Sequence, residues 1–367
     1  MTTEPPRRDA SLEEVVKNLS DAAGISGYEA EVRQILRGYL EPYTSVERDN
    51  LGSLVTRKGG EGGRDKPKIM LAAHMDEIGF MVTRITPEGH LRFQTIGGWW
   101  DNVLLAQRVV IKTKSGDVPG VIGSKPPHIL EEEERKKVIP SKDMFIDIGA
   151  TSEAMAKEAG VRPGDPVVPW SPFSAMKQAS VFQGKAFDDR LGCAGLVEVV
   201  RQLGNEKHPN IVFAVGTVQE EVGTRGAATS AWVVNPDVAV ILEVGIAQDV
   251  PGMKESEIEL HMGQGPALFL YDATMIPNLK LRDLFIDTAE KLGIPLQFSA
   301  MPRGGTDGGK IHVHTSGVPS VVLGVPVRYI HSHTGIFHMD DLRNMVRLVI
   351  GAIERLDAKT VQSVIEA

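Results

Sequence analysis

The chain alternates between two kinds of hydrophobic pattern. Short continuous apolar runs predict buried strands. They lie at 68–73, 210–217, 238–244 and 296–299. Between or after them come amphipathic stretches with apolar residues every three to four positions, which predict helices. These stretches lie at 190–203, 224–233, 278–292 and 340–356, the last of which closes the fold. Such alternation is typical of an α/β fold in which helices flank a largely parallel or mixed sheet.

Two more helices are expected near the N-terminus. Ser11 followed three residues later by Glu14 has the spacing of a capping box, which begins a helix. Ser26 and Glu29 repeat this spacing before a second amphipathic run that continues to Leu40. The large domain therefore opens with a helical pair.

The pattern changes between residues 77 and 177, where short β-prone runs are separated by Gly, Pro and charged turns. These runs lie at 80–85, 108–113 and 145–148, and one helix is expected at 152–159. We interpret this segment as an inserted, small β-rich domain. The large domain then comprises residues 1–76 and 178–367.

Composition narrows the class of protein. With 367 residues, 42% hydrophobic and 24% charged, the chain is an ordinary globular protein of about two domains. Lys and Arg total 40 against 48 for Asp and Glu, which disfavours nucleic acid and anionic membranes as partners. The N-terminal residues lack a secretory apolar segment, and no apolar run approaches the ~20 residues of a membrane span. The single cysteine, Cys193, fits a reducing cytoplasm.

Imidazole and carboxylate side chains fall at the ends of five predicted elements. They are His74, Asp188, Glu221, Glu243 and His331. In an open α/β sheet such ends share one edge, so these side chains are expected to meet in one cleft. Several carboxylates in a partly dry cleft repel one another unless cations neutralise them. The pattern therefore predicts two divalent ions, with Zn or Co favoured over Mg or Ca because imidazole is a borderline-soft ligand.

Two histidines and three carboxylates are about what two ions need if one carboxylate bridges them. Asp188 is the expected bridge, with His74 and Glu243 completing one ion and Glu221 and His331 the other.

Two further acidic residues have expected roles beside the ligands. Asp76 lies two residues beyond His74, on the same side of an extended segment, so its carboxylate is expected to accept the second imidazole N–H. Glu220 diverges from Glu221 on an extended backbone and is the expected general base.

Other readings remain open at this stage. His333 rivals His331, and His312 and His314 alternate in a Gly-bounded segment as further possible ligands. Asp188 could belong to a simple charged N-cap in the Asp188-Asp189-Arg190 run.

The glycine-rich run 304–309 lacks the Lys-Ser/Thr pair of a phosphate loop. Thr306 and Asp307 within it either orient ligands or substrate, or cap a helix.

Several motifs together resemble the tetrahedral-type dinuclear metalloaminopeptidases, a family that includes glutamyl and deblocking aminopeptidases. They are Ala72-Ala73-His74-Met75-Asp76-Glu77-Ile78-Gly79, Phe187-Asp188-Asp189-Arg190, Gln219-Glu220-Glu221-Val222-Gly223, Gly304-Gly305-Thr306-Asp307 and Arg328-Tyr329-Ile330-His331-Ser332. The resemblance implies a phosphorylase/hydrolase-like domain and an inserted PDZ-like barrel that mediates dimerisation. It also implies dimers that assemble into a dodecamer, peptide substrates, and the ligand and base roles given above.

The sequence departs from the family pattern at one ligand. Glu243 stands where relatives commonly have Asp, and its extra methylene moves the carboxylate by roughly one bond length. Its ligation is therefore the least secure of the five.

Fold resemblance leaves several activities open. N-acyl amino acid deacylases and carboxypeptidases use the same fold and metal chemistry. Some homologues carry the name endoglucanase, which would require a glycosidase carboxylate pair and no metal. A catalytically silent assembly protein is a further alternative.

Overall fold

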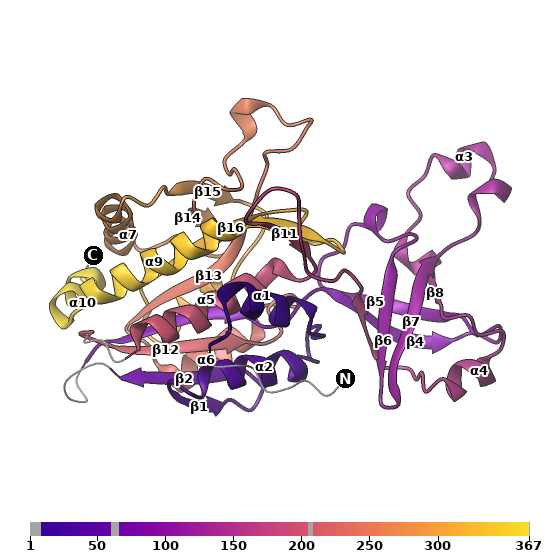
Figure 1. Cartoon of the computed structure of the whole chain (residues 1–367), viewed down its shortest axis with the longest axis horizontal. Coiled ribbons are helices and arrows are strands. Elements are labelled where there is room, and N and C mark those ends of the chain that lie inside the picture. Colours follow the sequence, from indigo (N-terminus) through magenta and orange to yellow (C-terminus); the bar gives the residue numbers. More distant parts are fainter. Residues whose placement is uncertain (1–8, 60–65, 205–207, 367) are drawn as a thin grey trace.

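The computed structural model describes residues 9–59, 66–204 and 208–366. The polar leader and most of the Gly-rich loop before residue 68 lie outside the described residues. Two bodies are visible in Figure 1: a large α/β domain and a smaller barrel beside it.

An 11-stranded mixed sheet forms the centre of the large domain. Its path runs β1-β2-β12-β3-β13-β16-β17-β11-β10, and β14 joins β16 to β15. In chain order the strands are β1 (Ser45–Arg48), β2 (Leu54–Gly59), β3 (Lys68–His74), β10 (Ser174–Ala175), β11 (Val181–Gly184), β12 (Ile211–Thr217), β13 (Val238–Ile246), β14 (Ala267–Asp272), β15 (Gln297–Met301), β16 (Ser320–Arg328) and β17 (Gly335–His338). The mixed α/β fold expected from the sequence is confirmed.

The four central strands β12, β3, β13 and β16 are mutually parallel. Their carboxyl ends therefore lie at one edge of the sheet. This arrangement is what brings residues distant in sequence to one place.

Alternate residues of these strands pack against helices on opposite faces, as a strand's two-residue period requires. Ile69 and Leu71 contribute to the larger core cluster, whereas Met70 and Ala72 contribute to a second cluster on the other face. Helices with residues in the larger cluster are α1 (Leu12–Asp21), α2 (Ala30–Leu40), α5 (Phe187–Leu203), α7 (Leu279–Leu292), α9 (Met339–Arg355) and α10 (Ala358–Ile365). Those with residues in the second are α6 (Arg225–Val234) and α8 (Gly308–Ile311).

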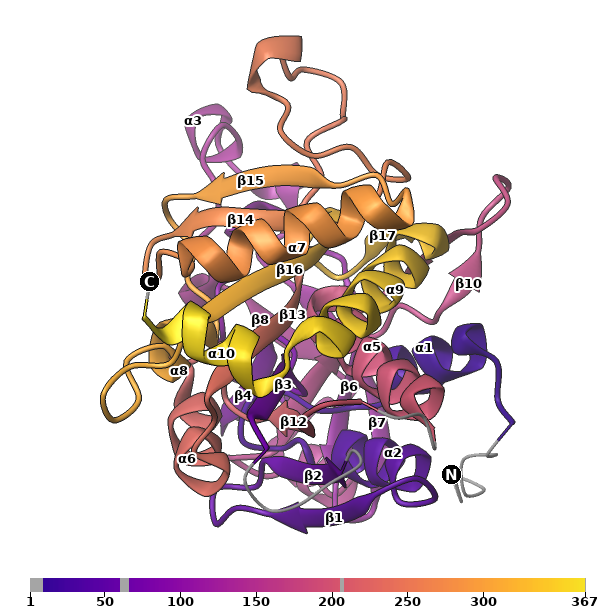
Figure 2. The ribbon, with the colours of Figure 1, turned by 90° about the vertical axis from the view of Figure 1, so that its left-hand side faces the viewer.

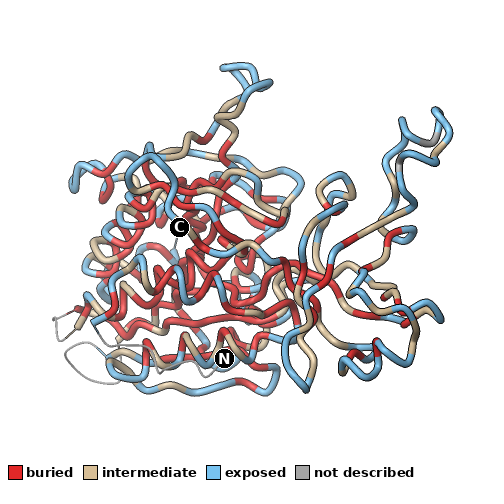
Figure 3. The backbone as a smooth tube through the Cα atoms, turned by 45° about the vertical axis from the view of Figure 1, so that its right-hand side comes forward, coloured by how far each residue is buried: buried red, intermediate tan, exposed pale blue. Residues whose placement is uncertain are grey.

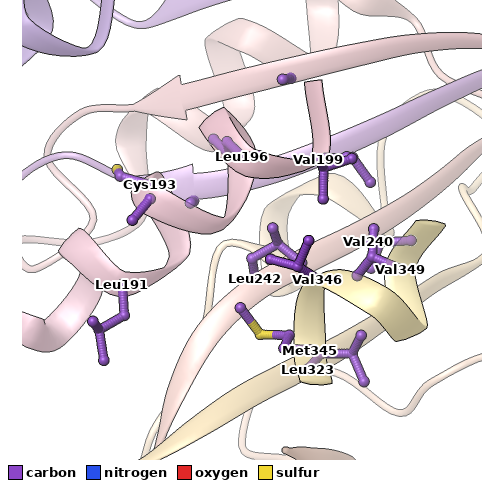
Figure 4. Packing of buried hydrophobic residues seen from close by; sticks show 14 of the residues in the cluster. Leu191, Cys193, Leu196, Val199, Val240, Leu242, Leu323, Met345, Val346 and Val349 are labelled. Atoms are coloured by element: carbon purple, nitrogen blue, oxygen red, sulfur yellow. The ribbon is translucent and has the colours of Figure 1, made fainter. Parts of the chain in front are cut away.

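Buried residues are concentrated in the interior of the large domain (Figure 3). Figure 2 shows α7, α9 and α10 in front of the sheet, and Figure 4 shows α5 packed against β13 and α9. Cys193 on α5 is free and buried in this core.

The smaller body is a closed antiparallel barrel with the strand order β4-β5-β8-β7-β6-β9. Its strands are β4 (Gly79–Ile85), β5 (Leu91–Ile96), β6 (Arg108–Thr113), β7 (Gly116–Gly123), β8 (Phe145–Asp147) and β9 (Pro166–Pro169), with short helices α3 (Glu132–Arg135) and α4 (Glu153–Glu158). It has its own core, which includes Phe80, Leu91 and Ile146. The barrel strands fall within the predicted insertion, while the division at 76/77 and 177/178 stays a prediction.

Two local predictions need correction. The spacing of Ser26 and Glu29 does not form a capping box: α2 begins at Ala30, and the Glu29 side chain makes no cap hydrogen bond. The Ser26 hydroxyl instead donates to the Asp76 carboxylate at 2.6 Å. The helix at 340–356 does not close the fold, because α10 follows it.

Within the described residues, no helix has the length and apolar character needed to cross a membrane.

Candidate active site

Strand register explains why the predicted residues meet. His74 ends β3 and pairs with Thr217, the last residue of β12. Glu220 and Glu221 follow directly beyond that end, and Glu243 lies in the neighbouring parallel strand β13. His331 comes three residues after β16, which lies on the other side of β13.

Asp188, at the start of α5, lies between the two imidazoles. Its Oδ1 is 2.9 Å from Nε2 of His74, and its Oδ2 is 3.3 Å from Nε2 of His331. One carboxylate thus faces both histidines, which is the geometry of a bridging ligand.

The three glutamates complete the cluster around these imidazoles. Glu243 Oε1 lies 3.8 Å and Glu220 Oε2 lies 4.0 Å from Nε2 of His74. Glu221 Oε1 lies 3.5 Å from Nε2 of His331. The structure therefore brings all five expected ligands and the expected base together, with the longer side chain of Glu243 accommodated.

Both imidazoles are held by their other ring nitrogen. Nδ1 of His74 donates to the main-chain carbonyl of Asp76 at 3.0 Å, and Nδ1 of His331 donates to the carbonyl of Gly98 at 2.7 Å. Because a carbonyl only accepts, each ring donates from Nδ1 and presents Nε2 toward the carboxylates, which leaves Nε2 as the nitrogen that could bind a metal ion.

Asp76 acts differently from the expectation. Its carbonyl, not its carboxylate, accepts the His74 N–H, since the nearest carboxylate oxygen is 3.6 Å away. The carboxylate instead accepts the backbone N–H groups of Glu220 and Glu221 at 3.0 and 3.1 Å. Asp76 therefore positions both glutamates as well as the histidine.

Asp189 has a structural role that the sequence indicated only as a possible helix cap. Its two carboxylate oxygens accept the backbone N–H groups of Gly192 at 2.9 Å and His74 at 3.1 Å. It links the start of α5 to the end of β3.

The rival residues lie elsewhere. His333 is buried against the rings of Phe80 and Trp99, with no hydrogen-bond partner for either nitrogen. His312 bonds the carbonyl of Gly308, and His314 packs against Trp232. None of these three contacts the cluster.

The Gly-rich run contributes a buried network. Thr306 accepts the Gly308 N–H and donates to Asp272. The Thr217 hydroxyl donates to Asp307, which makes no side-chain cap on α8. The Thr306 hydroxyl therefore satisfies a backbone N–H at the start of α8, as a capping residue does. Asp307 instead accepts the hydroxyl of Thr217, the last residue of β12.

Comparison with known proteins agrees with this geometry. The sequence profile of the M42 glutamyl aminopeptidase family matches residues 52–348. The chain belongs to this family.

Relatives similar to the chain along nearly its whole length carry aminopeptidase names. FrvX of Escherichia coli (strain K12), provisionally named an aminopeptidase, is 42% identical and aligns over 95% of this chain and 97% of its own. Glutamyl aminopeptidase of Lactococcus lactis subsp. cremoris (strain MG1363) is 34% identical, over 95% and 98%. Lysyl aminopeptidase of Pyrococcus furiosus is 33% identical, over 94% and 97%.

Solved structures show the same fold. The TET aminopeptidase of a marine sediment Thaumarchaeota archaeon has a TM-score of 0.93 at 52% identity, covering 96% of this chain and 98% of that one. The TET1 peptidase of Pyrococcus horikoshii, described as assembling into a tetrahedron or an octahedral shell, has a TM-score of 0.84 at 34% identity, covering 94% and 100%. A Thermotoga maritima structure named an endoglucanase has a TM-score of 0.77 at 30% identity, covering 95% and 99%.

Burial dominates the electrostatics of this M42 site. Burial raises the pKa of Glu220 and of Glu243 well above the usual carboxyl range. Burial, followed by the nearby Asp188 carboxylate, raises the pKa of Glu221 to about 8. Only Asp188 is shifted down among these acids, because the hydrogen bonds from His331 and His74 outweigh its burial and lower its pKa.

The donor set fits divalent ions. Two sets of potential ligand atoms lie within 4.8 Å of one another: His74 with Asp189 and Glu243, and His74 with Asp188 and Glu221. Since both oxygens of Asp189 already accept backbone N–H groups, Asp188 is the better ligand of the adjacent pair. Imidazole and carboxylate together suit ions such as Zn²⁺.

Protein stripped of metal by EDTA should become less stable as the pH rises from 6 to 9. Burial alone would lower the pKa of His331, but Asp188 and Glu221 raise it to about 10, and Glu221 is raised to about 8. Both groups hold protons in the folded state that the unfolded chain has released at the same pH, so stability is lost as the pH rises through these values.

Thermal unfolding of the EDTA-treated protein should therefore show a lower midpoint at pH 9 than at pH 6. Glu221→Gln, which removes one of these protons, should show a shallower decline. Added Zn²⁺ or Co²⁺ should abolish the decline, because metal takes the place of the protons. A midpoint that is constant or rises over this range without metal would contradict the account.

Proposed function

We propose that the chain is a metal-dependent aminopeptidase that removes N-terminal residues from peptides with two divalent ions, Zn or Co. The observation that carries this proposal is the placement of Asp188 between Nε2 of His74 and Nε2 of His331. The proposed ligands are His74, Asp188, Glu221, Glu243 and His331.

The ions, when bound, supply Lewis-acid polarisation of the scissile carbonyl and make water a stronger nucleophile at neutral pH. His74 and Glu243 would hold one ion, Glu221 and His331 the other, and Asp188 both. The buried carbonyl and carboxylate of Asp76 fix the orientation of His74 and of the two glutamates.

Glu220 is the proposed general base. Its side chain is largely buried, and Oε2 lies 4.0 Å from Nε2 of His74. Asp76 and Asp189 accept backbone N–H groups, but the Glu220 carboxylate accepts none from the described residues. It takes a proton from the water that attacks the carbonyl carbon, and passes the proton to the amine nitrogen as the carbon–nitrogen bond breaks. The products are a free amino acid and a peptide shortened by one residue.

The relatives favour this reaction over the alternatives. Those at 33% identity and above that we compared carry aminopeptidase names. The neighbour named an endoglucanase shares the fold, but glycoside hydrolysis needs a pair of carboxylic groups and has no use for imidazoles on both sides of Asp188. Deacylase and carboxypeptidase activities are distinguished by substrate.

Assembly and location complete the proposal. The similar TET1 peptidase from Pyrococcus horikoshii has also been solved as a dodecamer, and we propose dimers and a dodecamer for this chain. We also propose a cytoplasmic location, because Cys193 is a free, buried cysteine, as is usual in a reducing compartment.

The purified protein should cleave peptides that have a free N-terminal amine, and EDTA should abolish this activity until Zn²⁺ or Co²⁺ is restored. The N-acetylated and C-terminally amidated forms of the same peptide serve as matched controls. Release of acetate from the acetylated form, with no cleavage of the free-amine form, would indicate a deacylase, and release of residues from the C-terminus a carboxypeptidase. Activity that resists complete metal removal would contradict the proposal.

Glu220→Gln should lower kcat by about 100-fold or more, because the amide cannot accept the proton. Its metal content should remain that of the unmodified protein, since Glu220 is not a proposed ligand. Glu47→Gln, on the exposed edge strand β1, is the matched control and should retain full activity. An active Glu220→Gln protein would remove Glu220 from the role of base.

A further inference from the structure

A loop of the barrel reaches the proposed metal site. Residues 97–100 follow β5 and run directly beside the side chains of Glu221 and His331. These contacts join the loop that follows β5 of the barrel to side chains of the large domain.

Gly98 holds His331 through its carbonyl. The carbonyl accepts the Nδ1–H of His331 at 2.7 Å. The His331 side chain is 40% exposed, whereas that of His74 is 2% exposed, so packing alone does little to fix the His331 ring. His331 also has a positive φ of 55°, at the turn that follows β16. The Gly98 carbonyl therefore determines which ring nitrogen faces the carboxylates.

A Cβ would be strained at Gly97 and tightly packed at Gly98. A Cβ at Gly98 would lie 3.0 Å from Nδ1 of His331. A Cβ at Gly97, whose φ is 79°, would lie 3.1 Å from Oε2 of Glu221 and 2.5 Å from Cγ2 of Ile78. The loop thus packs its backbone against two proposed ligands of the same ion.

Trp99 anchors the loop on the barrel. Its Nε1–H donates to the carbonyl of Gly79 at 3.0 Å, and its ring stacks on Phe80 with centroids 4.7 Å apart. The same ring lies 5.1 Å from that of His333, two residues beyond His331. The loop is therefore fixed relative to the start of β4, the first strand of the barrel.

The histidine of the other proposed ion is oriented by a different group. His74 is oriented by the carbonyl of Asp76, which lies in the connection between β3 and the barrel, and by burial within the large domain. The two halves of the site thus differ in the origin of the groups that orient their histidines.

We propose that Gly97, Gly98 and Trp99 of the barrel are positioning residues for the ion bound by Glu221 and His331, and that they set its affinity separately from that of the ion bound by His74 and Glu243. This inference rests on the proposed two-metal function. It gives the inserted barrel a part in completing the metal site.

The test is a Co²⁺ titration of EDTA-stripped protein. Calorimetry measures the affinity of each equivalent, and visible absorption reports the coordination of the bound Co²⁺. The unmodified protein should bind two equivalents, and His331→Ala should show which one belongs to the Glu221/His331 subsite. Gly98→Ala should weaken that equivalent by about 10- to 100-fold and change its absorption, because the added Cβ displaces the His331 ring from the carbonyl that orients it. The other equivalent should keep its affinity.

Gly59→Ala is the matched control, because a Cβ there meets no atom of the described residues within 4 Å, and it should bind as the unmodified protein does. Trp99→Phe keeps the ring stack but removes the N–H anchor, and it should shift the same equivalent in the same direction. If circular dichroism shows that Gly98→Ala does not fold, the Trp99→Phe titration tests the inference in its place.

Equal weakening of both equivalents, or unchanged binding in the folded variants, would overturn this inference and leave the proposed function standing. Fewer than two equivalents in the unmodified protein would overturn the proposed function itself. The unmodified titration and the variant titrations therefore separate the two failures.

Discussion

The mutual repulsion of buried carboxylates is the constraint on which this structure depends. Asp188, Glu220, Glu221 and Glu243 crowd one edge of the sheet, where burial raises the pKa of all three glutamates and only Asp188, between the two imidazoles, has a lowered pKa. Such a concentration of acids persists in a folded protein only if positive charge compensates for it. Protons and two imidazoles supply part of that charge, and divalent cations would supply the rest.

The scaffold beneath the site is itself held by a buried cation. Arg190, fully buried at the start of α5, donates to the main-chain carbonyls of Leu19, Gly24 and Met75, and lies 3.4 Å from the carboxylate of Glu77. These bonds join α1, the turn before α2 and the end of β3 to the helix that presents Asp188. Because a guanidinium forms several fixed bonds at once, it suits this joint better than a lysine would.

Most of the fold and the gathered residues could be predicted from sequence, because buried parallel strands read as apolar runs and their polar ends stand out. The His74, Glu221 and His331 positions were accessible in this way. The helix start at Ser26 was not, since its hydroxyl serves Asp76 across the fold instead of a local cap. The roles of the Asp76 and Gly98 carbonyls could not be predicted from sequence, because a backbone acceptor has no side-chain signature. The related feature of the sequence is the doublet Gly97-Gly98, which permits close approach of the backbone.

Anomalous X-ray diffraction from crystals containing Co²⁺ or Zn²⁺ tests the central claim most directly. The account predicts two peaks about 3.5–4 Å apart. One should lie beside His74 and Glu243, the other beside Glu221 and His331, with an oxygen of Asp188 near each. A single peak, or peaks away from Asp188 at full metal loading, would contradict the account.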